Sequence, residues 1–535
     1  MIFDRVKSLD AILATAEKKS LHRSLGAFQL TMLGIGAIIG TGIFVLTAAA
    51  AQKAGPGMMF SFMIAGFVCA VAALCYSELA SMVPVSGSAY TYTYAVMGEL
   101  LAWMVGWALI LEYAVAASAV CVGWSGYVMG LIHSTTGLGL PDFLNSGPAW
   151  GLSGFMPTVD FSHGVINLPA ILVAGAVTWL LVLGTSESAS VNAVLVAIKI
   201  VALTAFIVLS MPLLKGENFT PLLPTGILGH DGLGVVGAAA SIFFAYVGFD
   251  AVSTAAEETK NPQRNVPIGL IGSLAICTIF YLLVAAGVVG TVGAQPVRDA
   301  AGMVLSPDGV AFANRCAELS ALGDAPIVCS KEALAETLRR INFPLIGNLV
   351  GLAASIALPS VILMMIYGQT RIFFVMARDG LLPEGLADVH PKYRTPWKMT
   401  IFTGICVAIA GAFFPVGQLA DISNSGTLFA FFMVALAVMI LRKTDPDRHR
   451  PFRTPLIWII APIAALGCLG LYLNLPFVAK MVLPIWGSIG LLIYFLYSRG
   501  HSHLGRGSVD VHERDPDAPP QPGGLAGPKV EARYS

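Results

Sequence analysis

The sequence predicts an all-α membrane protein whose helices cross the bilayer many times. Hydrophobic residues make up 56% of the 535 residues and charged residues only 12%. The mean hydropathy is +0.77, well above that of soluble domains. Apolar runs of about 20 residues, the length that crosses a bilayer as a helix, recur along the chain. These runs are continuous, which favours helices over the short alternating strands of a membrane barrel.

Twelve apolar runs are interpreted as twelve transmembrane helices. They cover residues 28–52, 57–83, 98–131, 167–184, 188–213, 234–256, 267–292, 343–370, 398–415, 420–441, 456–473 and 479–498. With both chain ends in the cytoplasm, the inner segments hold 22 of the 31 Lys and Arg residues and the outer segments hold eight. This asymmetry predicts a multi-pass protein of the cell inner membrane, embedded in lipid, with both termini cytoplasmic.

The two chain ends and one insert lie outside the apolar runs. Residues 1–24 are predicted to be a cytoplasmic segment, either a helix on the bilayer surface or a solvated tail, because they lack the apolar core of a cleavable signal peptide. Residues 499–535 are rich in Pro, Gly and charge, which predicts a disordered cytoplasmic tail. Between them, residues 25–498 form the transmembrane domain, with an outer insert at 293–342 that we expect to form a small helical cap.

Two of the eight cysteines lie in this outer insert. Cys316 and Cys329 would face an oxidising compartment, where a disulfide can persist. Whether they pair stays open at this point. The other six cysteines fall within predicted spans, where a cysteine is usually a small buried apolar residue.

The first span contains "GAIIGTGIFV", residues 36–45, with Gly36, Gly40 and Gly42 inside seven positions. Glycines four apart also form a helix-packing motif, so this span alone leaves two explanations open. The sixth span has a second interruption, because Gly248 and Asp250 lie deep in its apolar sequence. Broken helices at corresponding positions of two repeats are the best sequence indication of a transporter's binding site.

The two spans are five apart, which fits an inverted repeat of five helices. At such breaks, free N–H groups bind a carboxylate and free carbonyls bind an ammonium. A zwitterionic amino acid offers both groups. The pattern therefore predicts an amino acid substrate bound near the middle of the membrane.

Five segments, one of them the glycine-rich stretch of the first span, carry a resemblance to a known family. They are "GAIIGTGIFV", "SELASMVPVSGSAYTYTY", "LEYAVAASAVCVGWSGY", "FFAYVGFDAVSTAAEETKNPQRNVP" and "GQTRIFFVMARDGLLP". In this order they resemble the signature segments of the amino acid-polyamine-organocation superfamily, most of all cationic amino acid transporters and their bacterial relatives. The resemblance implies a LeuT-like five-plus-five (5+5) inverted repeat, with repeats at about 25–213 and 234–441 and two additional helices at about 456–498.

The resemblance also implies the substrate-binding residues. The amides that bind the carboxylate correspond to Thr41 and Gly42, and Gly40 permits the break. The carbonyls that receive the amino group correspond to Ile38 in the first span and to Phe244, Ala245 and Val247 in the sixth span. The ring of Phe244 would also cover the bound substrate.

Lys199 lies eleven residues into the fifth span, about 16 Å deep at 1.5 Å per residue. At that depth a lysine needs partners or loses its proton, and burial lowers the lysine pKa. A permanently charged structural lysine is the alternative. Proton-coupled relatives place a fifth-span lysine between the first and eighth spans, so the resemblance implies that Lys199 couples transport to protons.

Three carboxylates in or beside the spans complete the candidate residues. Glu112 in the third span either faces the pocket, where it would select a cationic substrate, or is structural. Asp250 is expected to stabilise the unwound sixth span. Glu78, near the inner end of the second span, is assigned to gating or anchoring contacts, together with Arg371 and Arg378.

These observations predict proton-coupled uptake of cationic or small neutral amino acids by alternating access. An amino acid or polyamine exchanger is the alternative within the same class, and a channel or a transport-dead sensor belongs to other classes. The sequence contains no GxSxG, HExxH, CxxC or Walker motif. Residues 232–237, "GLGVVG", match GxGxxG, but a polar loop precedes them and a span follows, which does not fit a dinucleotide fold. An enzyme, a metal site, a cofactor and a nucleic acid partner are therefore not expected. A small accessory membrane subunit is a partner on which the sequence is silent.

Overall fold

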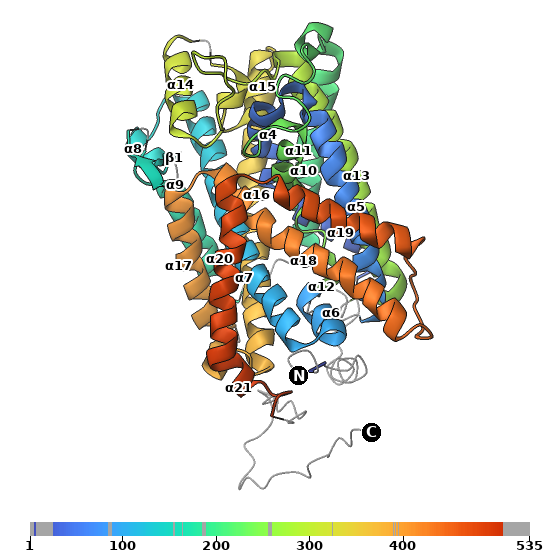
Figure 1. The fold of residues 1–535 in the computed structure, drawn as a ribbon. Coiled ribbons are helices and arrows are strands. Elements are labelled where there is room, and N and C mark those ends of the chain that lie inside the picture. The colour runs from blue at the N-terminus through green and yellow to red at the C-terminus, as the bar shows by residue number, and fades with distance from the viewer. Residues whose placement is uncertain are drawn as a thin grey trace.

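The computed structural model describes residues 5–6, 25–83, 88–153, 156–162, 164–184, 189–254, 259–323, 325–388, 390, 392–393 and 395–506. Within these residues the chain forms a bundle in which many helices run along a common direction, whereas those at Val416–Thr444 and Ile457–Leu473 cross it obliquely, with short helices and loops at both ends (Figure 1). Most of the predicted segment 1–24 and residues 507–535 of the predicted tail lie outside the described residues.

Seven described helical stretches are long and apolar enough to cross a membrane. They are Leu46–Met82, Glu99–Thr136, Val191–Leu213, Pro262–Val292, Pro344–Arg378, Val416–Thr444 and Phe477–His501. Five shorter apolar helices accompany them: Ala27–Ile38, Leu168–Val182, Gly234–Tyr246, Trp397–Phe413 and Ile457–Leu473. Length and composition thus indicate a multi-pass membrane protein.

The individual elements follow in chain order. The helices of the first half are α2 (Ala27–Ile38), α3 (Thr41–Phe44), α4 (Leu46–Ala54), α5 (Met58–Met82), α6 (Ser88–Met97), α7 (Glu99–Thr136), α8 (Asp142–Asn145), α9 (Leu168–Val182) and α10 (Ala189–Ser210). Those of the second half are α11 (Gly234–Ile242), η4 (Phe243–Tyr246), α12 (Ala251–Thr254), α13 (Pro262–Val292), α14 (Val310–Ala321), α15 (Ala333–Arg340), α16 (Pro344–Arg378), α17 (Trp397–Phe413), α18 (Val416–Thr444), α19 (Ile457–Leu473), α20 (Phe477–Ile493) and α21 (Arg499–His501). The 3-10 turns η1 (Gly55–Gly57), η2 (Met211–Leu213), η3 (Gly216–Phe219), η6 (Ile327–Cys329) and η7 (Glu384–Ala387), and the π-helical turn η8 (Tyr494–Ser498), lie between them.

One small sheet departs from the all-helical expectation. Strands β1 (Ala149–Ser153) and β2 (Met156–Asp160) form an antiparallel hairpin in which Trp150 lies opposite Val159. The hairpin rests on the end of α17, since the Trp150 ring stacks on Phe414 with ring centroids 4.9 Å apart. Two five-residue strands in a loop leave no hydrophobic pattern strong enough to be recognised in the sequence.

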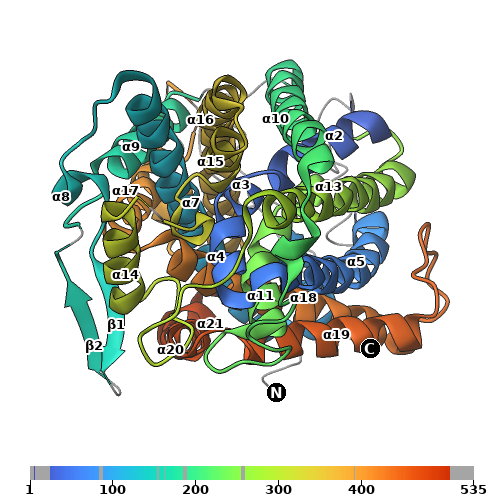
Figure 2. The same ribbon diagram turned by 90° about the horizontal axis from the view of Figure 1, so that it is seen from above.

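Helix α7 lies at the centre of the bundle, packed against α16 and α18, while α13 packs against α5 and α2. The arrangement seen from above places α10 and α20 at the periphery (Figure 2). Burial decreases from the centre of the bundle to its periphery. In the most apolar window of the central stretch Glu99–Thr136, 78% of the residues are buried, against 22% for the peripheral stretch Phe477–His501. The outer faces of the peripheral helices are apolar and exposed, as membrane contact requires.

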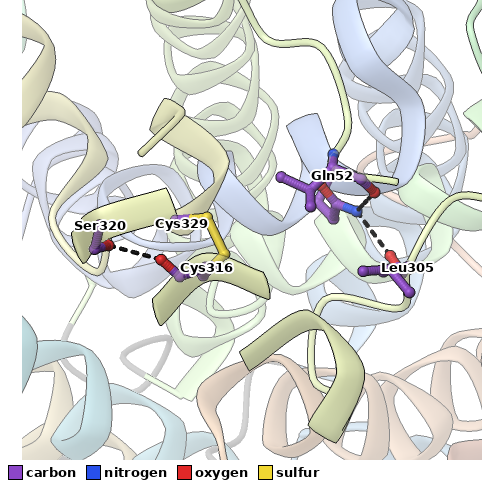
Figure 3. Close-up of a disulfide and its surroundings, with 6 residues drawn as sticks. Gln52, Leu305, Cys316, Ser320 and Cys329 are labelled. Atoms are coloured by element: carbon purple, nitrogen blue, oxygen red, sulfur yellow. Dashed lines mark hydrogen bonds between the residues drawn. A yellow bond between two sulfur atoms is a disulfide. The ribbon is translucent and has the colours of Figure 1, made fainter. Parts of the chain in front are cut away.

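Residues of the outer insert form α14, η6 and α15 at one end of the bundle, which we call the cap end (Figure 1). A disulfide joins Cys316 in α14 to Cys329, with their Cα atoms 5.7 Å apart (Figure 3). The insert is therefore cross-linked within itself.

The described parts of the two chain ends meet at the opposite end of the bundle, around the buried carboxylate of Glu99. Arg5 Nη1 donates to Glu99 Oε1 over 3.1 Å and to the Arg499 carbonyl over 3.0 Å. The Tyr494 hydroxyl donates to Glu99 Oε1 over 3.0 Å, and Ser502 donates to the other oxygen. Residues 499–506 of the predicted tail are thus docked on α7.

Candidate functional site

The first apolar span is interrupted where its glycines predict an interruption. Helix α2 ends at Ile38, Gly40 adopts an extended conformation (φ −143°, ψ −147°), and α3 begins at Thr41. The first N–H groups of a new helix have no intrahelical acceptor, which here concerns Thr41 and Gly42. The Thr41 side chain is 1% exposed, and its Oγ1 has no hydrogen-bond partner among the described residues.

The sixth span is also interrupted. Helix α11 tightens into the 3-10 turn η4, Val247 is extended (ψ 137°), and Gly248 has a φ of 109°. Only glycine adopts this φ without strain, and a Cβ at Gly248 would lie 2.9 Å from the Ala37 carbonyl oxygen. Gly248 therefore lets the broken sixth span lie directly on the first.

The two breaks are in contact with each other. A Cβ on Gly42 would collide with the Cα atom of Ala245. The hydroxyl of Tyr281, from α13, lies 2.9 Å from the carbonyl oxygens of both Ile38 and Ala245. A hydroxyl has one hydrogen to donate, so the two carbonyls share a single donor. Tyr281 was missed in the sequence, where it is one more aromatic residue in an apolar run.

The remaining residues predicted to bind substrate lie at the same place. Phe244 and Val247 are 6% and 5% exposed and flank Ala245 in the sixth-span break. Gly40 faces α16, where a Cβ would lie 3.5 Å from Val361. The fold thus gathers the predicted residues of the first and sixth spans into one buried region.

Lys199 reaches the first span from α10. Its Nζ donates a 2.8 Å hydrogen bond to the carbonyl of Gly36, and the residue is 1% exposed. Gly36 permits the approach, because a Cβ there would meet the side chains of Val196 and Asn192 on the same face of α10. The predicted proton-coupling lysine is therefore bonded to α2 shortly before the break.

Glu112 lies away from the first break and closer to Asp250, at the end of the sixth-span break. The part of α7 that faces the first break is Gly123, where a Cβ would lie 2.5 Å from Thr41 Cγ2. Glu112 precedes it by eleven residues of the continuous helix α7, or about 16 Å at 1.5 Å per residue. Glu112 instead lies against α18, with its Cβ 3.3 Å from a Cβ built at Gly426.

Asp250 is in the same region as Glu112. The hydroxyl of Tyr113, the neighbour of Glu112, donates to Asp250 Oδ2 over 3.2 Å. Ser253 Oγ donates to the Asp250 carbonyl over 2.6 Å, which holds the turn that leads into α12. These contacts place Asp250 at the turn before α12, and its structural part in the unwound sixth span stays a prediction.

Glu78 is the centre of an anchor between three segments at the end opposite the cap. Arg442 from α18 binds both carboxylate oxygens, over 2.7 and 2.8 Å. The Thr454 N–H donates over 2.8 Å, and Arg450 Nε lies 3.3 Å from Oε1. Burial lowers the pKa of Arg450. The sequence indicated an anchoring part for Glu78 but not these partners, which come from distant segments.

A buried ion pair near the cap end was also missed. Lys53 Nζ in α4 lies 2.9 Å from Asp421 Oδ2 in α18, and both side chains are 3% exposed. Ser241 of α11 hydrogen-bonds with both of them. The predicted first span ends at residue 52, which places Lys53 in the outer segment, whereas α4 continues to Ala54. This pair connects the first, sixth and tenth spans.

Comparison with known proteins gives one consistent result. Residues 25–497 match the family described as Amino acid permease. The chain is 44% identical over 503 residues to the branched-chain amino acid permease BcaP of Bacillus subtilis (strain 168), which covers 94% of this chain and 99% of the relative. The methylthioribose transporter of the same organism is 39% identical with the same coverage. The vacuolar cationic amino acid transporter 2 of Arabidopsis thaliana is 33% identical over 448 residues, 83% of this chain and 64% of the relative.

Proposed function

The chain belongs to the amino acid permease family of the amino acid-polyamine-organocation superfamily, and from this premise we propose that it is a proton-coupled amino acid transporter that works by alternating access. The family level supports amino acid transport and a protein that is not an enzyme. We further propose the five-plus-five repeat, with α2–α4 and α11–α12 as the matching broken spans and α19 and α20 as the additional helices. In this arrangement the cap end faces outward and both chain ends are cytoplasmic.

The proposed binding mode uses backbone groups of both breaks. The amides of Thr41 and Gly42 bind the substrate carboxylate at the start of α3, where the helix dipole favours negative charge. The carbonyls of Ile38 and Ala245, with those of Phe244 and Val247, receive the ammonium group. The observation that carries this proposal is the direct contact of the two breaks, with two predicted ammonium acceptors sharing the single hydroxyl of Tyr281.

Proton coupling is proposed to act through Lys199. Its bond to the Gly36 carbonyl ties α10 to the segment before the first break. A protonated lysine donates this bond with a full charge, which strengthens it, and loss of the proton weakens it. The position of α2, and with it the first half of the binding site, would then depend on the protonation state of Lys199.

We propose neutral aliphatic amino acids as the substrate class. An extended arginine or lysine side chain reaches roughly 7 Å from its Cα, which is two of the 3.6 Å steps of an extended chain. Glu112 lies farther away, about 16 Å along α7 from Gly123, the residue that faces Thr41. A cationic side chain that extends from the first break would therefore not reach Glu112. The relative that is 44% identical is named for branched-chain amino acids, which supports the same class.

Uptake by purified protein in liposomes tests the proposal. With an inward proton gradient, labelled leucine should accumulate, and excess unlabelled isoleucine or valine should compete better than lysine, arginine or methylthioribose. Gly42→Ala should abolish uptake, because the added methyl group collides with Ala245. Gly175→Ala is the matched control, since no atom lies within 4 Å of a Cβ built there.

Folded protein that takes up no amino acid would refute the transport proposal. Competition by lysine and arginine that equals that of isoleucine would refute the substrate class alone. Uptake by Gly42→Ala at the rate of Gly175→Ala would show that the contact between the breaks is not part of the site.

A further inference from the structure

The cap loop, residues 293–309, connects α13 to α14 and is attached to the first span beside the Lys53–Asp421 ion pair. Gln52, the neighbour of Lys53, donates from Nε2 to the carbonyls of Val297 and Leu305 over 2.9 and 2.8 Å. The Val297 N–H in turn donates to Gln52 Oε1 over 2.7 Å. Figure 3 shows Gln52 directed at Leu305, beside the cross-linked α14. Three hydrogen bonds to one buried side chain thus fix the cap loop to α4.

A second attachment joins the cap loop to α18. Asp308 is the carboxylate at the end of this loop, and it lies directly against Gly417 in the first turn of α18. The approach is close enough that a Cβ on Gly417 would collide with the Asp308 carboxylate. The cap loop therefore bridges α4 and α18, the same two helices that the Lys53–Asp421 pair joins.

The charges around Asp308 do not balance. Lys53 from α4 and Asp421 from α18 are the charged groups that act on Asp308, and Lys53 is already paired with Asp421. Within the loop, Arg298 donates to the carbonyls of Gly302 and Pro224. The described groups around an ionised Asp308 therefore leave one negative charge in excess, and removing that charge from water is costly.

We propose that Asp308 is a proton-binding site on the cap end, and that proton binding there holds the cap loop docked across α4 and α18. When the loop lifts, Asp308 enters water and ionises freely. When the loop docks, a protonated Asp308 brings no excess charge to the Lys53–Asp421 pair. The proposal goes beyond amino acid transport, because it concerns access to the ion pair and holds whatever the substrate is.

The titration of Asp308 supports the direction of this effect. Asp308 as a whole residue is partly exposed, but burial of its carboxylate raises the pKa to about 7, against the opposing influence of Lys53. A carboxylate in water has a pKa of about 3.9. Because the docked state has the higher pKa, docking takes up a proton. The stabilisation of the docked state by this proton is complete below about pH 4 and is lost as the pH rises through about 7. With pKa values of about 7 when docked and about 3.9 in water, the docking equilibrium constant falls about thirtyfold between pH 5.5 and 8.5.

Hydrogen–deuterium exchange of the full chain in lipid nanodiscs tests the proposal without any transport measurement. The amide of Val297 is a direct reporter, because its acceptor is a side chain of α4. After correction for the pH dependence of the chemical exchange rate, protection of the segment around Val297 should fall about thirtyfold between pH 5.5 and 8.5. Asp308→Asn, which cannot ionise, should keep high protection at both pH values.

Asp299→Asn is the matched control, because Asp299 lies in the same loop and its carboxylate accepts only from the Ala301 and Met303 amides among the hydrogen bonds described. This variant should keep the pH dependence of the unaltered protein. Protection in the unaltered protein that does not change with pH would overturn the proposal, and this result does not depend on whether a variant folds. An Asp308→Asn protein that retains the full pH dependence would overturn it as well. Amino acid uptake stays a separate measurement, so failure of either proposal leaves the other intact.

Discussion

Replacing Lys199 by alanine is the sharpest test of proton coupling. The substitution removes the charged donor to the Gly36 carbonyl and the proposed proton carrier together. One lysine carries one proton per cycle, and a gradient of one pH unit stores about 1.4 kcal/mol per proton. With the membrane potential clamped at zero, one-to-one coupling therefore permits accumulation of a substrate up to about tenfold per pH unit. The variant should show no accumulation.

The assay uses liposomes at pH 7 inside and pH 6 outside, with valinomycin and equal potassium on both sides. Labelled leucine is followed until its internal concentration is constant. Lys480→Ala is the matched control, because Lys480 is at an exposed position near the start of α20, where it donates to the Leu473 carbonyl over 3.2 Å. Accumulation by Lys199→Ala that equals that of the control would refute the assignment. Accumulation in the unaltered protein well beyond tenfold would show that further groups carry protons.

Three further predictions concern stability. Glu78→Gln should lower the free energy of unfolding by about 3–5 kcal/mol, since it leaves the buried Arg450 and the partly buried Arg442 without their counter-charge; a melting temperature within one degree of the unaltered protein would contradict the anchor. Tyr281→Phe should lower the melting temperature of the substrate-free protein, because the free energy of unfolding falls by about 1–2 kcal/mol. Leucine should stabilise this variant more than the unaltered protein, because the ammonium group of leucine offers the missing donors. A smaller stabilisation by leucine would place the ammonium group elsewhere. Cys316→Ser should destabilise the insert by about 3 kcal/mol, the value for a loop of similar length, because it opens the disulfide to Cys329 across a sequence separation of 13. Limited proteolysis at the insert measures this loss of stability. Cleavage no faster than in the unaltered protein would contradict the prediction.

The helical class and the two interruptions could be predicted from the sequence because each depends on residues that are close together in the chain. Composition and run length are properties of a continuous stretch, and the breaks depend on glycines within a few positions of each other. Gly248 illustrates the reason: its φ of 109° restricts the position to glycine, so the conformation is visible in the residue type. The depth of Lys199 in the membrane is inferred from its distance to the start of the apolar run and stays a prediction.

The partners of the buried polar groups were not predictable in the same way. Lys53 and Asp421 are 368 positions apart, and Glu78 and Arg442 are 364 apart. No local pattern relates such residues, since their pairing is created by the packing of α4, α5 and α18. Tyr281 was missed for the same reason, because its importance comes from two carbonyls in other segments. The residues predicted to bind substrate remain predictions, as do the repeat boundaries and the cytoplasmic placement of the chain ends.

The docking of both chain ends on Glu99 has a practical consequence for recombinant protein. A truncation placed where hydropathy falls, after Ser498, would delete Ser502 and the Arg499 carbonyl that receives Arg5. The shortened protein would lose contacts that fasten its first residues as well as its last. Purification tags are therefore better appended beyond Arg506, and a head-to-tail reporter pair fused to the termini would report on the integrity of this junction in living cells.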